Sequence, residues 1–225
     1  LSLHDALPIC LRWVLDFKWL RPMDLGLLLW PSSTDGTRRA YKVIREWLSK
    51  KWILERHHED LGCKVIVLTE SGARYLKSEG IPYAQPDTDW GRINNGIWRP
   101  GKEWRHDFIC TRLALCLLHR GFSIKTERQV RAEYSKARSE KWPDLLALDP
   151  SEDVQFWIEV ESSRKTGKNM DDLAKTLIRL HERDDGIFLK QKAFPAIAFI
   201  EGTRDTQTGH RINHLGRVKS AIRRF

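Results

Sequence analysis

Apolar residues recur at helical spacing in three segments near the start of the chain. The pattern predicts helices over residues 10–17, 21–30 and 37–50. Pro31 ends the second helix, because the residue before a proline disfavours helical backbone. The apolar face of the third helix consists of Ala40, Val43, Ile44, Trp47 and Leu48. The third helix therefore combines a face to be buried with a basic face available to solvent.

Two short apolar strands follow, over residues 52–56 and 64–68, joined by a polar tip that contains Gly62. A closing helix begins with Thr69-Glu70-Ser71-Gly72. This strand-to-helix sequence resembles the end of many bacterial winged-helix DNA-binding domains, and the resemblance implies that helix 37–50 is a recognition helix and the hairpin tip a wing. The residues expected to contact DNA are Thr37, Arg38, Arg39, Lys42, Arg45, Arg56 and Lys64. A winged helix that serves protein contact, with a merely solvated basic face, is the alternative.

Two segments fall outside the predicted domains. Residues 80–101 are rich in proline, glycine and asparagine without periodicity, which predicts a linker between a first domain over 10–79 and a second over 102–225. Residues 1–9 resemble the translation of a sequencing-adapter oligonucleotide. We therefore expect them to be an adapter-derived scar and exclude them from the fold.

The second domain alternates helical and strand patterns. Helices are predicted over 103–118, 170–183 and 212–223, and strands over 123–130, from Asp144, over 154–161 and over 194–200. The last strand is a continuous apolar run, as expected of a strand buried on both faces. The order of elements predicts an α/β domain with a central mixed sheet, and the whole chain is expected to be α/β.

Acidic residues mark two of these strands. Asp144 opens an apolar strand, and Glu159 and Glu161 lie on one face of the next, because successive side chains of a strand point to opposite sides. If the two strands pair, Asp144 lies close to Glu159. Such a cluster of carboxylates is costly unless a hard cation such as Mg²⁺ neutralises it.

This arrangement resembles the PD-(D/E)XK nuclease superfamily, in which Pro-Asp on one hairpin strand precedes an acid-x-Lys triplet on the next. The matching residues are Pro143-Asp144 and Glu159-Val160-Glu161. The resemblance implies an endonuclease-like domain that hydrolyses DNA phosphodiesters, in which Asp144, Glu159 and Glu161 hold Mg²⁺ or Mn²⁺ and Glu161 ligates or orients the attacking water.

The resemblance departs from the superfamily at two positions. Glu161 stands where the superfamily usually has its lysine, as in some active restriction endonucleases, and Lys165 is the candidate to stabilise charge on the phosphate instead. The superfamily often places an acid on the first helix. Here the neighbourhood offers His106 as a candidate catalytic residue, and a structural hydrogen-bonding histidine is the alternative.

The combination of a winged helix, Trp104-Arg105-His106-Asp107 and the acidic strands also resembles the replication-relaxation proteins of plasmids and other mobile elements, over residues 10–165. That resemblance makes DNA the expected partner, and the formal charge of +9 agrees with a polyanionic one. No apolar run approaches the ~20 residues that span a bilayer, so no membrane partner is expected. Four cysteines without a paired framework favour the cytoplasm. A homodimer is left open.

Two functions from different classes follow. The first is a DNA-binding protein of a plasmid or mobile element with a metal-dependent endonuclease domain. The second is a non-catalytic DNA-binding replication or relaxation factor, or a transcriptional regulator, on a degenerate nuclease fold. A repressor with a ligand-binding or dimerisation domain is a third reading, in which Asp144 and Glu159 have no evident use.

Overall fold

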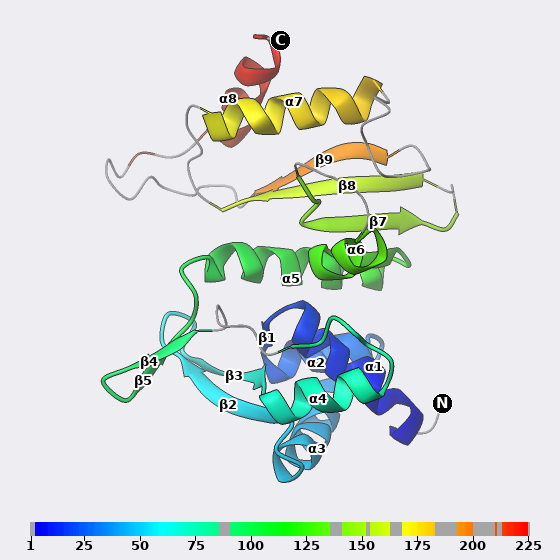
Figure 1. Cartoon of the computed structure of the whole chain (residues 1–225), viewed down its shortest axis with the longest axis vertical. Coiled ribbons are helices and arrows are strands. Elements are labelled where there is room, and N and C mark those ends of the chain that lie inside the picture. Colours follow the sequence, from blue (N-terminus) through cyan, green and yellow to red (C-terminus); the bar gives the residue numbers. More distant parts are fainter. Residues whose placement is uncertain are drawn as a thin grey trace. The chain divides into compact units, whose positions relative to one another are not determined.

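The computed structural model describes residues 3–85, 91–135, 141–151, 154–162, 168–182, 193–199, 210 and 213–224. The chain divides into two compact units, Leu1–Thr111 and Arg112–Phe225 (Figure 1). The division falls within helix α5 (Trp104–His119). The sequence pattern placed the whole of this helix in the second domain, whereas the contacts assign its first turns to the first unit.

The first unit contains the predicted helices. They are α1 (Leu3–Asp16), α2 (Pro22–Leu29), α3 (Gly36–Ser49) and α4 (Glu70–Ser78). The predicted apolar face of α3 is buried at Ala40, Val43, Ile44 and Trp47. Thr69 caps α4, because its side chain accepts a hydrogen bond from the Gly72 amide at 3.0 Å. α1 begins at Leu3, inside the segment that resembles a translated adapter.

Helices α2 and α3 pack closely where two glycines meet. A Cβ atom on Gly26 would lie 2.7 Å from the carbonyl carbon of Gly36 and 2.8 Å from the amide nitrogen of Thr37. Both neighbours are backbone atoms and cannot move aside like a flexible side chain. Only glycine at position 26 permits this approach of the two helices.

A three-stranded antiparallel sheet completes this part of the unit, in the order β1-β3-β2. Its strands are β1 (Trp19–Leu20), β2 (Ile53–His58) and β3 (Cys63–Leu68). The β2–β3 hairpin was predicted. β1 was not, because two residues are too short for an alternating pattern to appear.

The turn from α3 into β2 forces a lysine into left-handed backbone. Lys51 has φ = 57°. Its amide donates to the Leu48 carbonyl at 3.0 Å and the next amide, of Trp52, donates to the Trp47 carbonyl at 2.9 Å. This is the Schellman arrangement that usually places glycine at the position of Lys51. The helix end therefore carries backbone strain that glycine would relieve.

Residues 80–101 were predicted to be a linker, and the structure gives part of this segment regular form. Strands β4 (Arg92–Asn94) and β5 (Ile97–Arg99) form an antiparallel hairpin. Asn95 and Gly96 both have positive φ, 49° and 77°, which a two-residue hairpin turn requires. The Tyr83 hydroxyl donates to Asp16 of α1 at 3.1 Å, so the segment before the hairpin contacts the first helix.

His58 lies at the centre of an aromatic cluster in the first unit and is fully buried. Its ring centroid lies 5.2 Å from that of Trp19, 5.9 Å from that of Trp98 and 4.7 Å from that of Trp104. The Leu61 amide donates to Nδ1 at 3.3 Å, and Nε2 has no hydrogen-bond partner among the described residues. Burial lowers the pKa of His58, because the apolar rings disfavour the charged imidazolium.

The second unit is built on a four-stranded mixed sheet in the order β6-β7-β8-β9. Its strands are β6 (Ser123–Thr126), β7 (Leu145–Asp149), β8 (Val154–Glu161) and β9 (Ala193–Phe199). The first three are antiparallel neighbours, whereas β8 and β9 run parallel. The prediction of an α/β protein with a mixed sheet is confirmed at this level.

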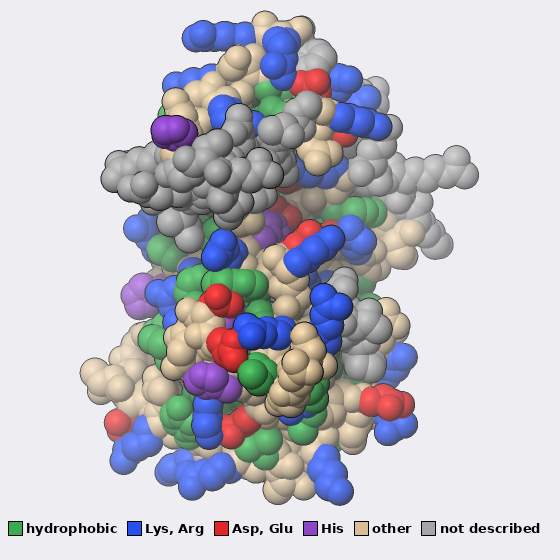
Figure 2. All heavy atoms as spheres, turned by 90° about the vertical axis from the view of Figure 1, so that its left-hand side faces the viewer, with side chains coloured by type: hydrophobic (Ala, Val, Ile, Leu, Met, Phe, Trp, Pro, Cys, Tyr) green, Lys and Arg blue, Asp and Glu red, His purple; other side chains and the backbone are tan. Residues whose placement is uncertain are grey.

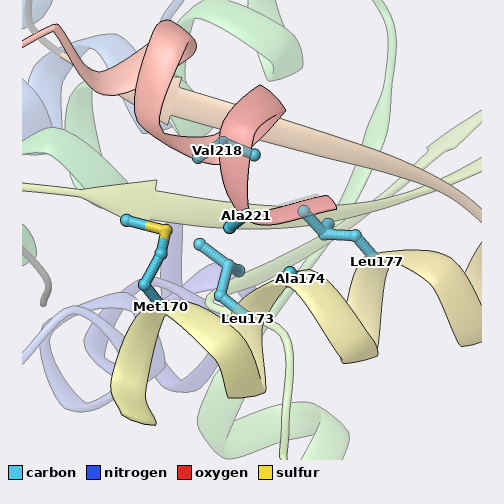
Figure 3. Packing of buried hydrophobic residues seen from close by; sticks show 6 residues of the cluster. All are labelled: Met170, Leu173, Ala174, Leu177, Val218 and Ala221. Atoms are coloured by element: carbon cyan, nitrogen blue, oxygen red, sulfur yellow. The ribbon is translucent and has the colours of Figure 1, made fainter. Parts of the chain in front are cut away.

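Helices α7 (Lys168–Glu182) and α8 (His214–Ile222) pack on each other (Figure 3). Their shared core consists of Met170, Leu173, Ala174, Leu177, Val218 and Ala221, and Ile197 of β9 packs against it. The same side of β8 contributes Trp157, which packs with Leu180 of α7 and Ala193. The two helices thereby cover one face of the sheet.

One strand prediction was too long. The strand predicted over 123–130 ends at Thr126, where helix α6 (Glu127–Glu133) begins. Thr126 and Gln129 form a capping box, in which each side chain bonds the backbone of the other residue. The capping box starts a helix where the apolar residues alone suggested a longer strand.

Two further expectations concern the environment of the chain. All four cysteines are free thiols, as expected. Among the described residues, no helix has the length and apolar content that crossing a membrane requires.

Candidate functional site

The pairing of β7 with β8 positions Asp144. Leu145 lies opposite Ile158, and the Asp144 amide donates to the Ile158 carbonyl at 3.1 Å. In return, the Val160 amide donates to Asp144 Oδ2 at 2.7 Å. The two strands pair, which is the condition under which the sequence places Asp144 close to Glu159. Asp144 is therefore fixed beside β8 through both its backbone and its carboxylate.

Glu159 is the buried centre of the site. Its residue is 1% exposed, and each carboxylate oxygen has a partner. Trp157 Nε1 donates to Oε1 at 2.7 Å, and the ammonium of Lys141 forms an ion pair with Oε2. Burial raises the pKa of Glu159, and the negative charge of Asp144 raises it further, while Lys141 and Trp157 act in the opposite direction. Asp144 and Glu159 thus interact electrostatically, as expected for paired strands.

Glu161 ends β8 on the same side as Glu159 and is 2% exposed. Among the described residues, no three His, Cys, Asp or Glu side chains lie close enough together to hold a metal ion. The structure therefore brings Asp144 and Glu159 together but does not gather all three acids into one cluster.

The two carboxylates fit one kind of metal ion. Mg²⁺ keeps several water ligands and binds proteins through one or two carboxylates, together with phosphate oxygens of a substrate. Asp144 and Glu159 offer two hard oxygen donors whose mutual repulsion a cation would relieve. An all-protein cage of the kind that structural Zn²⁺ needs is not formed by the described residues.

Two predicted catalytic residues remain, Lys165 and His106. Lys165 falls outside the described residues. His106 belongs to the first unit, on α5, where its Nδ1 lies 3.7 Å from Cys110 Sγ and 3.6 Å from Asp107 Oδ1. These neighbours suit a structural hydrogen-bonding histidine, which is the alternative to a catalytic role for His106.

Lys141 is the site residue that the sequence did not reveal. It lies three positions before Asp144, outside the strand, and reaches Glu159 across the β7–β8 pair. The only signal in the sequence is that a lysine directly precedes Trp142-Pro143-Asp144. The contact becomes evident once the strand register is known.

The basic side chains expected to bind DNA lie mostly on the exposed side of α3. Thr37, Arg38, Arg39, Lys42 and Arg45 are exposed, as is Lys64 in the hairpin, whereas Arg56 is half-buried. Arg38 pairs with Asp35 at 2.7 Å and Lys64 with Glu55 at 3.1 Å, both near the surface. Lys and Arg side chains are also spread over the face shown in Figure 2, with acidic side chains among them. Basic charge alone therefore does not single out one surface.

Comparison with known proteins adds no relative. No protein-family model, curated protein or solved structure matches the chain significantly.

Proposed function

We propose that the protein binds DNA through a winged-helix domain over residues 10–79 and cleaves it with a metal-dependent domain of the PD-(D/E)XK type over residues 102–225. The observation that carries the proposal is the pair Asp144 and Glu159, two interacting carboxylates beside paired strands. The order of β6 to β9, an antiparallel meander followed by a parallel strand, supports the proposed nuclease-like fold.

The chemistry would be hydrolysis of a phosphodiester. Asp144 and Glu159 would hold Mg²⁺ or Mn²⁺, which supplies Lewis acidity and a more acidic bound water. The bond from the Val160 amide keeps the Asp144 carboxylate turned toward β8, and the Trp157 indole fixes one oxygen of Glu159. These contacts hold two carboxylates in place before any substrate arrives, which favours catalysis by positioning.

The proposed partner is DNA of a plasmid or another mobile element, as the likeness to replication-relaxation proteins implies. The exposed basic side of α3 supports a recognition-helix role, since its opposite side is fully used in the core. We also infer a cytoplasmic location, which the four free cysteines support.

Cleavage is tested with purified protein, supercoiled, linear, single-stranded and branched DNA, and Mg²⁺ or Mn²⁺. Asp144→Asn and Glu159→Gln remove the charges with little change of shape, and Asp172→Asn removes an exposed acid of α7 as the matched control. We expect metal-dependent cutting by the wild type and the control, and a loss of about 100-fold or more in each site variant. Equal cutting by all four proteins would show that the activity comes from elsewhere.

DNA binding is tested separately on α3. We expect Arg39→Ala and Lys42→Ala to weaken binding and each to reduce the slope of log affinity against log salt concentration by about 0.9, the value for one lost phosphate contact. Arg74→Ala on α4, with a side chain that is 70% exposed, is the matched control. If the slope of log affinity against log salt concentration is the same for all three variants, α3 does not contact the DNA backbone as proposed.

A specific observation favours the second function, a non-catalytic DNA-binding replication factor or regulator. Both oxygens of Glu159 already have protein partners, and Glu161 stands where the superfamily usually has lysine. In that case the wild-type protein binds DNA in a salt-sensitive manner and cuts none of the substrates with either metal.

A further inference from the structure

We propose that Lys141 supplies the amine of this site, in place of the lysine that position 161 lacks. The inference rests on the proposed nuclease function and deepens it. Its basis is the ion pair between the Lys141 ammonium and Glu159 Oε2, formed by two residues 18 positions apart in the chain.

The contact joins a buried group to a partly exposed one. The Glu159 side chain is 1% exposed, whereas that of Lys141 is 28% exposed. The ammonium is therefore more accessible to solvent than the carboxylate with which it pairs. An ammonium has three donors, so Lys141 can keep one hydrogen bond to the protein and offer another to a phosphate oxygen.

The position of Lys141 depends on elements that also fix the carboxylates. The chain from Lys141 leads through buried Pro143 into Asp144, whose backbone and side chain bond β8. The pairing that brings Asp144 to β8 thereby also brings Lys141 to Glu159. A lysine in this place can serve the reaction without belonging to the acid-x-Lys strand.

The role is charge stabilisation with no net proton transfer to lysine. A water oxygen forms a bond to phosphorus while the bond from phosphorus to the leaving oxygen breaks, and the electron pair of that bond departs on the leaving oxygen. The attacking water gives up one proton to solvent, and the leaving oxygen takes one up from solvent. Lys141 stays protonated throughout and donates a hydrogen bond to a non-bridging phosphate oxygen, on which negative charge increases.

This assignment has a second consequence that does not depend on activity. A divalent cation held by Asp144 and Glu159 would lie near the Lys141 ammonium, and the two positive charges would repel each other. Removing the ammonium should tighten metal binding while slowing cleavage. A lysine that merely supports the structure gives a different result, because its loss would disorder Glu159 and weaken metal binding and cleavage together.

The test uses the full chain with Lys141→Met, which keeps the length of the side chain, and Lys141→Arg, which keeps the charge. Lys125→Met is the matched control, because Lys125 belongs to the same unit, is 44% exposed and pairs with Glu133. Mn²⁺ binding is measured by calorimetry without DNA, and cleavage of supercoiled plasmid is measured at saturating Mn²⁺. Should Lys141→Met lose its folded circular dichroism spectrum, Lys141→Gln replaces it, since its amide can still donate to Glu159.

We expect Lys141→Met to bind Mn²⁺ about 10-fold more tightly and to cut about 100-fold more slowly, the order of loss found when one charge-stabilising donor is removed. Lys141→Arg should restore part of the cleavage, and Lys125→Met should match the wild type in both measurements. Unchanged cleavage in Lys141→Met, or a joint loss of Mn²⁺ binding and cleavage, overturns the inference while leaving the nuclease function in place. A wild type that cuts no substrate overturns the proposed function, and this inference with it.

Discussion

The ion pair between Lys141 and Glu159 makes a quantitative prediction for stability in the absence of metal. Lys141→Met leaves the carboxylate of Glu159, 1% exposed, without its cation. A buried carboxylate in this position has an alternative to remaining charged, because it can take up a proton. The cost of the substitution therefore cannot greatly exceed the cost of protonating Glu159 at the working pH.

That limit can be calculated. Protonating a carboxyl with an ordinary pKa of 4.5 costs about 1.36 kcal/mol for each pH unit above that value. The upper limit is thus about 3.4 kcal/mol at pH 7 and about 0.7 kcal/mol at pH 5. The sign follows from the direction of the pKa shift. Burial already raises the pKa of folded Glu159, and loss of Lys141 raises it further, so the stability of the variant falls as the pH rises from 4.5 towards neutrality.

Urea unfolding followed by circular dichroism, in EDTA at pH 5 and pH 7, measures this cost. We expect Lys141→Met to lose about 1–3 kcal/mol at pH 7 and less than about 1 kcal/mol at pH 5. In a Glu159→Gln background, the same substitution should cost less than about 1 kcal/mol at either pH, because no buried charge remains. A loss that is equal at the two pH values, or equally large beside Gln at position 159, would refute the assignment of this contact as an ion pair that stabilises the fold.

Three further predictions concern the first unit. Lys51→Gly should raise the free energy of unfolding by about 1 kcal/mol, because glycine adopts left-handed backbone without strain. Lys50→Gly is the control and should lower the free energy of unfolding, since Lys50 has an ordinary φ of −80°. Urea midpoints that shift in the same direction for both variants would contradict this prediction. Gly26→Ala should cost about 1–3 kcal/mol, since its Cβ meets backbone 2.7 Å away, and a thermal midpoint equal to that of the wild type would show that the helices separate without penalty. The pKa of buried His58 is lowered, so His58 binds a proton more readily in the unfolded chain than in the folded one, and the free energy of unfolding should fall as the pH drops below 6.5. A His58→Gln variant should lack this part of the pH dependence. An unchanged slope of unfolding free energy against pH in that variant would contradict the prediction.

Much of the fold followed from local patterns. Helix α3 was predicted because Ala40, Val43, Ile44 and Trp47 repeat at helical spacing, and the structure buries all four. Strand β1 and the β4–β5 hairpin were not predicted, because strands of two or three residues are too short to show an alternating pattern. The start of α6 was missed for a different reason: the Thr126 and Gln129 capping box is a local signal that the apolar residues around it obscured.

The site was predictable to the extent that it depends on one strand. Alternation placed Glu159 and Glu161 on one side of β8, and Pro143-Asp144 suggested the neighbouring strand. Which groups contact Glu159 depends on the register between β7 and β8, which alternation within a single strand does not specify. For this reason Lys141 was missed.

The two bonds that Asp144 makes to β8 affect how an acid at this position should be interpreted in other chains. Its carboxylate accepts the Val160 amide at 2.7 Å, so the side chain closes one end of the strand pair as well as facing the candidate site. A protein that had abandoned catalysis would still lose sheet stability by giving up this acid, because a buried amide would be left unpaired. Retention of aspartate here is therefore poor evidence that an enzyme is active.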